Sequence, residues 1–240
     1  MKVSKPADSR AGRTAATLPA WPTVLVVIAH PDDESFGLGA VIDQFAAGGA
    51  AVHILCFTHG EASTLNQTRT SLRRARETEL RQAAAELGAA SVTLLDYPDG
   101  GLAGLPPGDL AGHVADAAAR VGASGMLVFD DTGVTGHPDH QAATRAAVLS
   151  GRRSQLPVLA WTLPAAVAAR LAAETAQPFA GQPPDRIDLC LRVSRQRQRQ
   201  AARLHVTQIP PKAVVWRRLQ LLGECEHLRW LVPALPSNTP

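Results

Sequence analysis

The stretch TVLVVIAHPDDESFG, residues 23–37, joins a run of apolar residues to a cluster of acids. Its apolar, β-branched part is typical of a strand buried on both faces of a sheet. His30, Pro31 and three consecutive acids follow directly where this strand is expected to end. Neighbouring carboxylates repel one another unless a cation or hydrogen bonds compensate. The stretch therefore predicts a buried strand that leads into a polar site.

The same alternation of short apolar runs and longer amphipathic segments continues along the chain. It predicts an α/β fold, a Rossmann-like three-layer sandwich with a mainly parallel sheet. After the first strand, further strands are expected at 51–59, 91–97, 125–131 and 156–162, and helices at 36–48, 68–88, 109–121 and 138–150.

The last third of the chain has a weaker pattern. RIDLCLRV (186–193) resembles a strand, and the next segment resembles a helix capped by Ser194. Residues 210–230 are interpreted as one further helix. No repeat or change of composition requires a second domain, so residues 21–240 are expected to form a single domain after a disordered basic tail at 1–20.

Composition excludes several classes of protein. Hydrophobic residues make up 45% of the chain and charged residues 19%, which is ordinary for a globular protein. The net charge of +3 equals the charge of the first twenty residues, so no basic face for nucleic acid is expected. Apolar runs are shorter than the roughly 20 residues that span a membrane. The three cysteines lack CxxC spacing, and no secretory segment precedes the first strand, which favours a reducing, cytoplasmic location.

Segments that contain histidines or acidic residues follow each of the first four expected strands. Because ligands bind beyond the carboxyl ends of parallel strands, these segments are expected to meet at one edge of the sheet. Imidazoles and carboxylates together form the ligand set preferred by zinc and similar divalent metals. The segments are HPDDE (30–34), THGEAS (58–63), DYPDGG (96–101) and DDTGVTGHPDH (130–140).

Two of these segments share the spacing of their ligand-capable residues. His30 and Asp33 are three residues apart, and so are His137 and His140. The spacing leaves two arrangements open: an open catalytic site with three protein ligands, or a closed site with all four. Glu34 is expected either to orient a ligand or to begin a helix.

AHPDDE (29–34) and GHPDH (136–140), each after an apolar strand, are similar to the two motifs of the PIG-L/LmbE-like family of zinc-dependent N-acetylglucosamine de-N-acetylases. ARLHVTQ (202–208) resembles, more loosely, a downstream element with Thr207 in the place of a serine. The resemblance implies an α/β sandwich, one zinc ion, and a small N-acylated sugar as substrate. It also implies hydrolysis of the acetyl amide by a metal-activated water.

The same resemblance implies a role for each matching residue. The zinc ligands would be His30, Asp33 and His140, the general base Asp32, and the residue that stabilises the oxyanion His137. Two softer matches, Arg76 and Asp99, correspond to positions that contact the sugar in mycothiol-pathway relatives. Thr135 stands where those relatives often carry an aromatic hydroxyl, which leaves oxyanion support and the substrate open.

Other classes of function have less support in the residues. A hydrolase of another bond remains an alternative, but no second carboxylate set for a two-metal site and no P-loop are present. A non-catalytic metal or sugar-binding module is a further alternative, although metal binding alone does not require the extra carboxylate of Asp32. Nucleotide binding is disfavoured because no GxGxxG follows the first strand.

Overall fold

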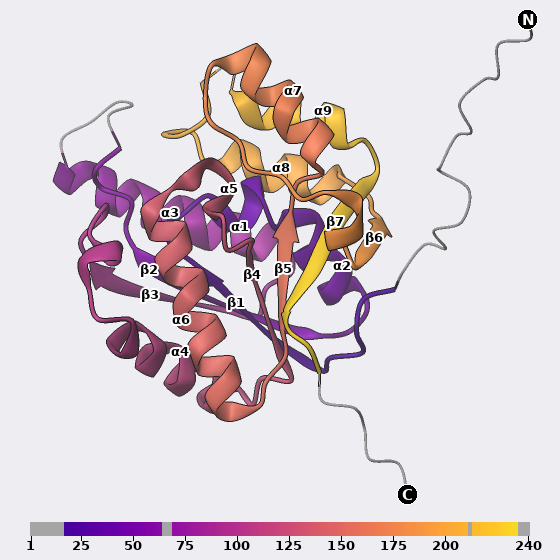
Figure 1. The fold of residues 1–240 in the computed structure, drawn as a ribbon. Helices are drawn as coiled ribbons and strands as arrows, with labels where there is room; N and C mark the ends of the chain where they lie inside the picture. The colour runs from indigo at the N-terminus through magenta and orange to yellow at the C-terminus, as the bar shows by residue number, and fades with distance from the viewer. Residues whose placement is uncertain (1–16, 64–68, 211–212, 235–240) are drawn as a thin grey trace, which may run out of the picture.

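The computed structural model describes residues 17–63, 69–210 and 213–234, in which one seven-stranded sheet forms the centre (Figure 1). The strand order is β3-β2-β1-β4-β5-β7-β6. β1 to β5 are parallel, whereas β7 is antiparallel to both of its neighbours. The strands are β1 Thr23–Ile28, β2 Ala51–Thr58, β3 Ser91–Tyr97, β4 Gly125–Phe129, β5 Val158–Thr162, β6 Leu189–Arg192 and β7 Cys225–Val232.

Helices connect the strands and cover both faces of the sheet. The α-helices are α1 Asp33–Phe36, α2 Gly39–Ala47, α3 Arg69–Glu86, α4 Pro107–Val121, α5 Gly133–Gly136, α6 Pro138–Ser154, α7 Ala165–Thr175, α8 Gln196–Leu204 and α9 Val214–Leu222. Short 3-10 helices span Leu102–Gly104 and Pro184–Arg186. No helix among the described residues is long and apolar enough to cross a membrane.

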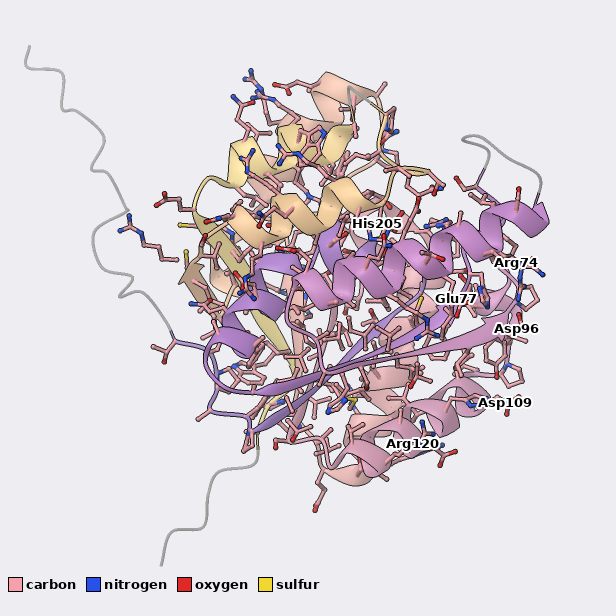
Figure 2. The ribbon with its side chains drawn as sticks, turned by 180° about the vertical axis from the view of Figure 1, so that it is seen from behind. Arg74, Glu77, Asp96, Asp109, Arg120 and His205 are labelled. Atoms are coloured by element: carbon pink, nitrogen blue, oxygen red, sulfur yellow. The ribbon has the colours of Figure 1, made fainter. Side chains whose placement is uncertain are left out.

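Alternate residues of β1 divide the core into two layers, because successive side chains of a strand point to opposite faces. Val24, Val26 and Ile28 pack with α2, α3 and α8, while Leu25 and Val27 pack with α4 and α6. The second pair of helices lies in front of the sheet in Figure 1, and α3 and α8 cross the opposite face in Figure 2. The predicted three-layer α/β sandwich is confirmed.

The helix expected at 36–48 is present as α2 but begins three residues later, because a separate short helix, α1, precedes it. α1 ends at Phe36, and α2 begins at Gly39. A Cβ atom at Gly37 would overlap the Phe129 ring, so the backbone passes closer to β4 here than another residue would allow. As a result, α1 is a separate single turn in the loop that follows β1.

Two predictions for the last third of the chain were wrong. The segment 210–230 is not one helix, because α9 ends before Gly223, which adopts a left-handed φ of 58°. The chain then returns as β7 between β5 and β6. The cap of α8 is also shifted by one residue: Arg195 occupies the N-cap position, and the Ser194 hydroxyl accepts the Gln196 N–H at 3.3 Å.

The predicted tail at 1–20 lies outside the described residues apart from its last four positions. β1 and β4 are neighbours at the centre of the sheet, and their chains continue to opposite sides, β2 and β5 respectively. A crevice at the carboxyl ends of such strands is the usual ligand site of this architecture. The loops with the two HPD sequences follow these two strands, which brings them together.

Candidate active site

A cavity of about 410 Å³ lies at the carboxyl ends of the central strands. The loop after β1 and α1 contributes one part of its wall, and the loop between β4 and α6 contributes another. All seven residues that the sequence analysis selected line this cavity: His30, Asp32, Asp33, Arg76, Asp99, His137 and His140.

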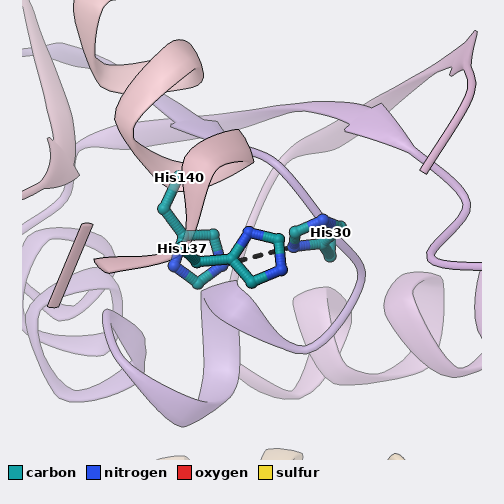
Figure 3. Close-up of side chains that lie close together, drawn as sticks. All are labelled: His30, His137 and His140. Atoms are coloured by element: carbon teal, nitrogen blue, oxygen red, sulfur yellow. Dashed lines mark hydrogen bonds between the residues drawn. The ribbon is translucent and has the colours of Figure 1, made fainter. Parts of the chain in front are cut away.

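Three side chains meet at the floor of this cavity. His30 Nδ1 lies 3.2 Å from His140 Nε2, and His140 Nε2 lies 3.1 Å from Asp33 Oδ1. The second oxygen of Asp33 accepts the His30 backbone N–H at 3.0 Å, which fixes the carboxylate against the end of β1. Figure 3 shows the ring of His137 beside these two imidazoles, and ring nitrogens of all three histidines lie within 4.8 Å of one another.

The outer nitrogens of the two inner imidazoles each lie near an oxygen, although His30 Nε2 has no partner in hydrogen-bond geometry. His140 Nδ1 lies 3.2 Å from the Gly133 carbonyl, and His30 Nε2 lies 3.0 Å from Asp99 Oδ1. Neutral rings with protons at those outer positions direct lone pairs toward each other and toward Asp33. A cation between them, either a proton or a metal ion, would satisfy this convergence of acceptors. The donor set, two imidazoles and one carboxylate with oriented outer nitrogens, fits a zinc-type ion.

The electrostatics of the cluster also favour positive charge. Burial by itself lowers the pKa of His30, but the carboxylates of Asp139 and Asp99 outweigh it and raise that pKa to about 10. Burial likewise lowers the pKa of His140, but the charge of Asp33 raises it above its usual value. Burial raises the pKa of Asp33, yet the two histidines hold it below its usual range.

Asp32 lies beside this cluster in a strained conformation. Its φ is 106°, in the left-handed region that non-glycine residues avoid, and its N–H donates to Glu34 Oε2 at 2.9 Å. Its Oδ2 receives a hydrogen bond of 2.9 Å from Arg76. Burial raises the pKa of Asp32 to about 6 although the charge of Arg76 opposes this shift. The carboxylate can therefore exchange a proton near neutral pH.

His137 has a different environment from the two inner histidines. It is the N-cap of α6, and its Nδ1 accepts the Asp139 backbone N–H at 3.2 Å. The ring proton of neutral His137 is therefore on Nε2. Partial burial and the neighbouring charges of His140 and His30 lower the pKa of His137, which keeps the ring neutral at pH 7.

The two softer sequence matches also have protein partners. Arg76 is buried, and its guanidinium donates to the backbone carbonyls of Pro31 and Gly60 as well as to Asp32. Asp99 accepts the Ala62 N–H at 2.8 Å through its second oxygen. Both residues line the cavity, and both also order the loops around it.

A buried network behind the site was missed by the sequence analysis. Glu34, for which that analysis left two roles open, lies in the first turn of α1 and is fully buried, and its Oε1 lies 2.6 Å from Nε2 of His205. Glu79 of α3 accepts hydrogen bonds from the Thr207 N–H at 3.0 Å and hydroxyl at 2.7 Å. Figure 2 shows His205 between α3 and α8. ARLHVTQ thus joins the C-terminal part of the chain to the loop of Asp32.

Other acids and histidines of the strand-end loops surround the inner cluster, and Asp99 and Asp139 form with His30 a second group whose ligand atoms lie within 4.8 Å of one another. Asp139 is buried beneath the inner cluster, where Oδ2 accepts the Gly100 N–H at 2.8 Å and lies 3.4 Å from His30 Nε2. Asp130 instead faces Gln182 and Arg229. His59 lies 3.9 Å from Asp96, away from the inner histidines.

Comparison with known proteins identifies the family. A sequence model of the PIG-L family, described as GlcNAc-PI de-N-acetylase, matches residues 25–150, which is more than half of the chain. The chain belongs to this family. The matched region contains both HPD loops and therefore every residue of the inner cluster.

Two curated relatives are similar over part of their length. A probable N-acetylglucosaminyl-phosphatidylinositol de-N-acetylase of Schizosaccharomyces pombe is 33% identical over 132 residues, which is 52% of this chain and 50% of the relative. A 1D-myo-inositol 2-acetamido-2-deoxy-alpha-D-glucopyranoside deacetylase of Mycolicibacterium vanbaalenii is 34% identical over 183 residues, 65% of this chain and 64% of the relative. The chain thus spans between half and two thirds of the length of these PIG-L relatives.

Solved structures support the fold of this PIG-L protein. The N,N'-diacetylchitobiose deacetylase of Pyrococcus horikoshii superposes with a TM-score of 0.68 at 19% identity, covering 89% of this chain and 85% of the other. The 4-carboxy-2-hydroxymuconate hydratase of Pseudomonas putida superposes with a TM-score of 0.65 at 22% identity, covering 91% and 99%. Because a hydratase has this fold too, the fold alone does not determine the reaction.

Proposed function

We propose that this PIG-L protein is a metal-dependent N-deacetylase that removes the acetyl or another acyl group from the amine of an N-acetylglucosamine-type sugar. The observation that carries the proposal is the convergence of His30 Nδ1, Asp33 Oδ1 and His140 Nε2 on one point, with the carboxylate of Asp32 beside it. A structural metal site has no need of that extra carboxylate, whereas hydrolysis requires a base at this position.

In this proposal the metal ligands are His30, Asp33 and His140, and the ion is zinc. His137 stays outside the ligand set, because one of its ring nitrogens accepts the Asp139 N–H and the other carries a proton. When bound, zinc supplies Lewis-acid chemistry, in which it polarises a carbonyl and makes water more acidic. Three ligands leave a coordination position open for this purpose.

The chain's own side chains handle the protons of the reaction. Asp32 takes a proton from the attacking water through Oδ1, since its Oδ2 is held by Arg76. The water oxygen bonds to the carbonyl carbon, and His137 donates a hydrogen bond from Nε2 to the oxygen that gains negative charge. The proton held by Asp32 then passes to the nitrogen, and the C–N bond breaks. The products are acetate and a free amine.

Arg76 and Asp99 are proposed to shape the sugar end of the cavity. Both are anchored by protein contacts, Arg76 to Asp32 and Asp99 to the Ala62 N–H. Anchored polar groups lose little rotational freedom when a hydroxyl group binds, which favours orientation of a sugar. These contacts support binding roles that extend, and do not replace, their structural roles.

Release of acetate tests the proposal. Purified protein is incubated with methyl N-acetylglucosaminide and related N-acetyl sugars, before and after chelation, and again after zinc is restored. We expect equal amounts of acetate and free amine, loss of both after chelation, and recovery with zinc. Bound zinc without acetate release from any of these sugars would reject the deacetylase and support a binding module or hydrolysis of another bond.

A further inference from the structure

Arg218 contributes a positive charge to the wall of the cavity from the C-terminal helix α9. It lies outside the region that the family model matches, and its guanidinium lies over the ring of Trp161, 5.2 Å from the ring centre. One of its terminal nitrogens donates to the Phe36 carbonyl, whereas its Nε is buried and has no hydrogen-bond partner. Buried polar groups normally have a hydrogen-bond partner, so this unpartnered donor favours an acceptor beside the guanidinium.

The acids around Arg218 are already engaged with other partners. Glu226 has the largest electrostatic influence on Arg218, but its carboxylate binds Arg195 and accepts the Trp161 indole N–H at 2.6 Å. Among the described residues, no carboxylate oxygen lies within 4.0 Å of an Arg218 nitrogen, which is the distance limit for an ion pair. Burial lowers the pKa of Arg218 to about 10, so the side chain is still charged at pH 7.

The other arginine of the cavity does not share this property. The guanidinium of Arg76 is neutralised by Asp32 and has further acceptors in two backbone carbonyls. Among the described residues, Arg218 therefore has no carboxylate within ion-pair distance, although Asp33 and Asp32 act on its charge from farther away. A desolvated guanidinium is stabilised best by an anion that accepts two parallel hydrogen bonds, such as a phosphate or carboxylate.

Aromatic rings connect this cation to the metal-type cluster. The Phe129 ring lies 5.0 Å from the His140 ring and 5.6 Å from the Trp161 ring, and Trp161 carries Arg218 on its face. One continuous wall thus runs from the reacting end of the cavity to the guanidinium. A substrate whose acetamide lies over the histidines can extend along this wall toward Arg218.

We propose that Arg218 is a specificity residue that binds an anionic substituent, a phosphate or a carboxylate, carried by the N-acylated amino sugar. This inference rests on the proposed deacetylase function and adds the charge of the substrate to it. It predicts that anionic glycosides are better substrates than neutral ones, and that the advantage depends on Arg218.

The test compares kcat/KM for four N-acetylated sugars. Methyl N-acetylglucosaminide is neutral, N-acetylglucosamine 1-phosphate and N-acetylglucosamine 6-phosphate carry phosphate, and N-acetylmuramic acid carries carboxylate. We expect at least one anionic sugar to exceed the neutral sugar by roughly 10-fold or more. Arg218→Gln should lower that ratio by roughly 10- to 100-fold, mostly through KM, and Arg218→Lys by less. The sugar with the largest change identifies phosphate or carboxylate as the ligand.

Arg217→Gln is the matched control, because Arg217 lies on the same helix and pairs with Glu174 at the surface. It should leave the selectivity ratio unchanged. Equal losses for neutral and anionic sugars in Arg218→Gln, or no anionic preference in the wild type, would overturn the inference while the deacetylase function stands. No acetate from any of the sugars would overturn both.

Discussion

Replacement of His205 by glutamine removes the positive partner of Glu34 and leaves a side chain that still donates a hydrogen bond. Both residues are completely buried, and His205 Nε2 lies 2.6 Å from Glu34 Oε1. Burial lowers the pKa of His205, but the charge of Glu34 and its hydrogen bond outweigh this and raise it. The contact therefore favours the protonated form of His205.

The expected loss of stability follows from this geometry. Breaking a buried ion pair costs about 3–5 kcal/mol, and a retained hydrogen bond to a charged acceptor restores part of it. His205→Gln should lower the free energy of unfolding by about 2–4 kcal/mol. The loss should be largest below about pH 6.5, which is the pKa of histidine in the unfolded chain. It should shrink as the pH rises through the higher pKa of His205 in the folded protein.

Activity should fall for a separate reason. The second oxygen of Glu34 accepts the N–H of strained Asp32, so a shift of Glu34 displaces the proposed base. A displacement of about 1 Å can cost roughly 100-fold in rate, so kcat should fall by roughly 10- to 100-fold with little change in KM and in zinc content.

Urea unfolding at several pH values, with steady-state kinetics on the zinc-loaded protein, checks both effects. His53→Gln is the matched control, since His53 bonds Ser91 at the surface, and it should change stability by less than about 0.5 kcal/mol. A His205→Gln protein as stable and as active as this control would show that the buried pair does not support Asp32.

Two further substitutions test His137 as the hydrogen-bond donor to the oxyanion and Gly60 as the residue that supports Arg76. His137→Ala should lower kcat by roughly 100- to 1000-fold in the acetate-release assay, because the Nε2 donor to the oxyanion is lost; a change confined to KM would argue for a role in binding only. Gly60→Ala places a Cβ against the Arg76 guanidinium at a φ of +64°, so it should lower both kcat and urea stability. A Gly60→Ala protein with unchanged kcat would show that Arg76 does not hold Asp32 for catalysis.

The sequence predicted the central part of the fold because local patterns there agree with one another. The β-branched run of β1 and the acids after it specify a buried strand and a polar loop within a single stretch. Local sequence patterns did not predict that the helix ends at Gly223. A helical pattern continues past this glycine in the sequence, but its positive φ ends α9, and alternate burial of Glu226 and Leu228 marks β7. Pairing with β5, far away in the sequence, decides that outcome.

The candidate site was likewise predictable from the sequence only in part. The position of each HPD loop after a parallel strand predicted that both loops meet at one edge of the sheet, and the structure brings His30, Asp33, His137 and His140 together there, whereas the choice of ligands among them came from the family resemblance. Spacing could not reveal the contact of Glu34 with His205, which lies 171 residues away. It also could not reveal the position of Arg218, since α9 reaches the cavity only through the packing of the last third of the chain.

Zinc content and turnover, measured together in Asp32→Asn and His140→Ala, test most directly whether the carboxylate beside the metal is the base. Asp32→Asn should retain about one equivalent of zinc and lose roughly 100- to 10,000-fold in kcat for acetate release. His140→Ala should lose zinc at concentrations that saturate the wild type. Loss of zinc from Asp32→Asn equal to that from His140→Ala, or full activity of Asp32→Asn with zinc bound, would contradict the proposed division of roles between Asp32 and Asp33.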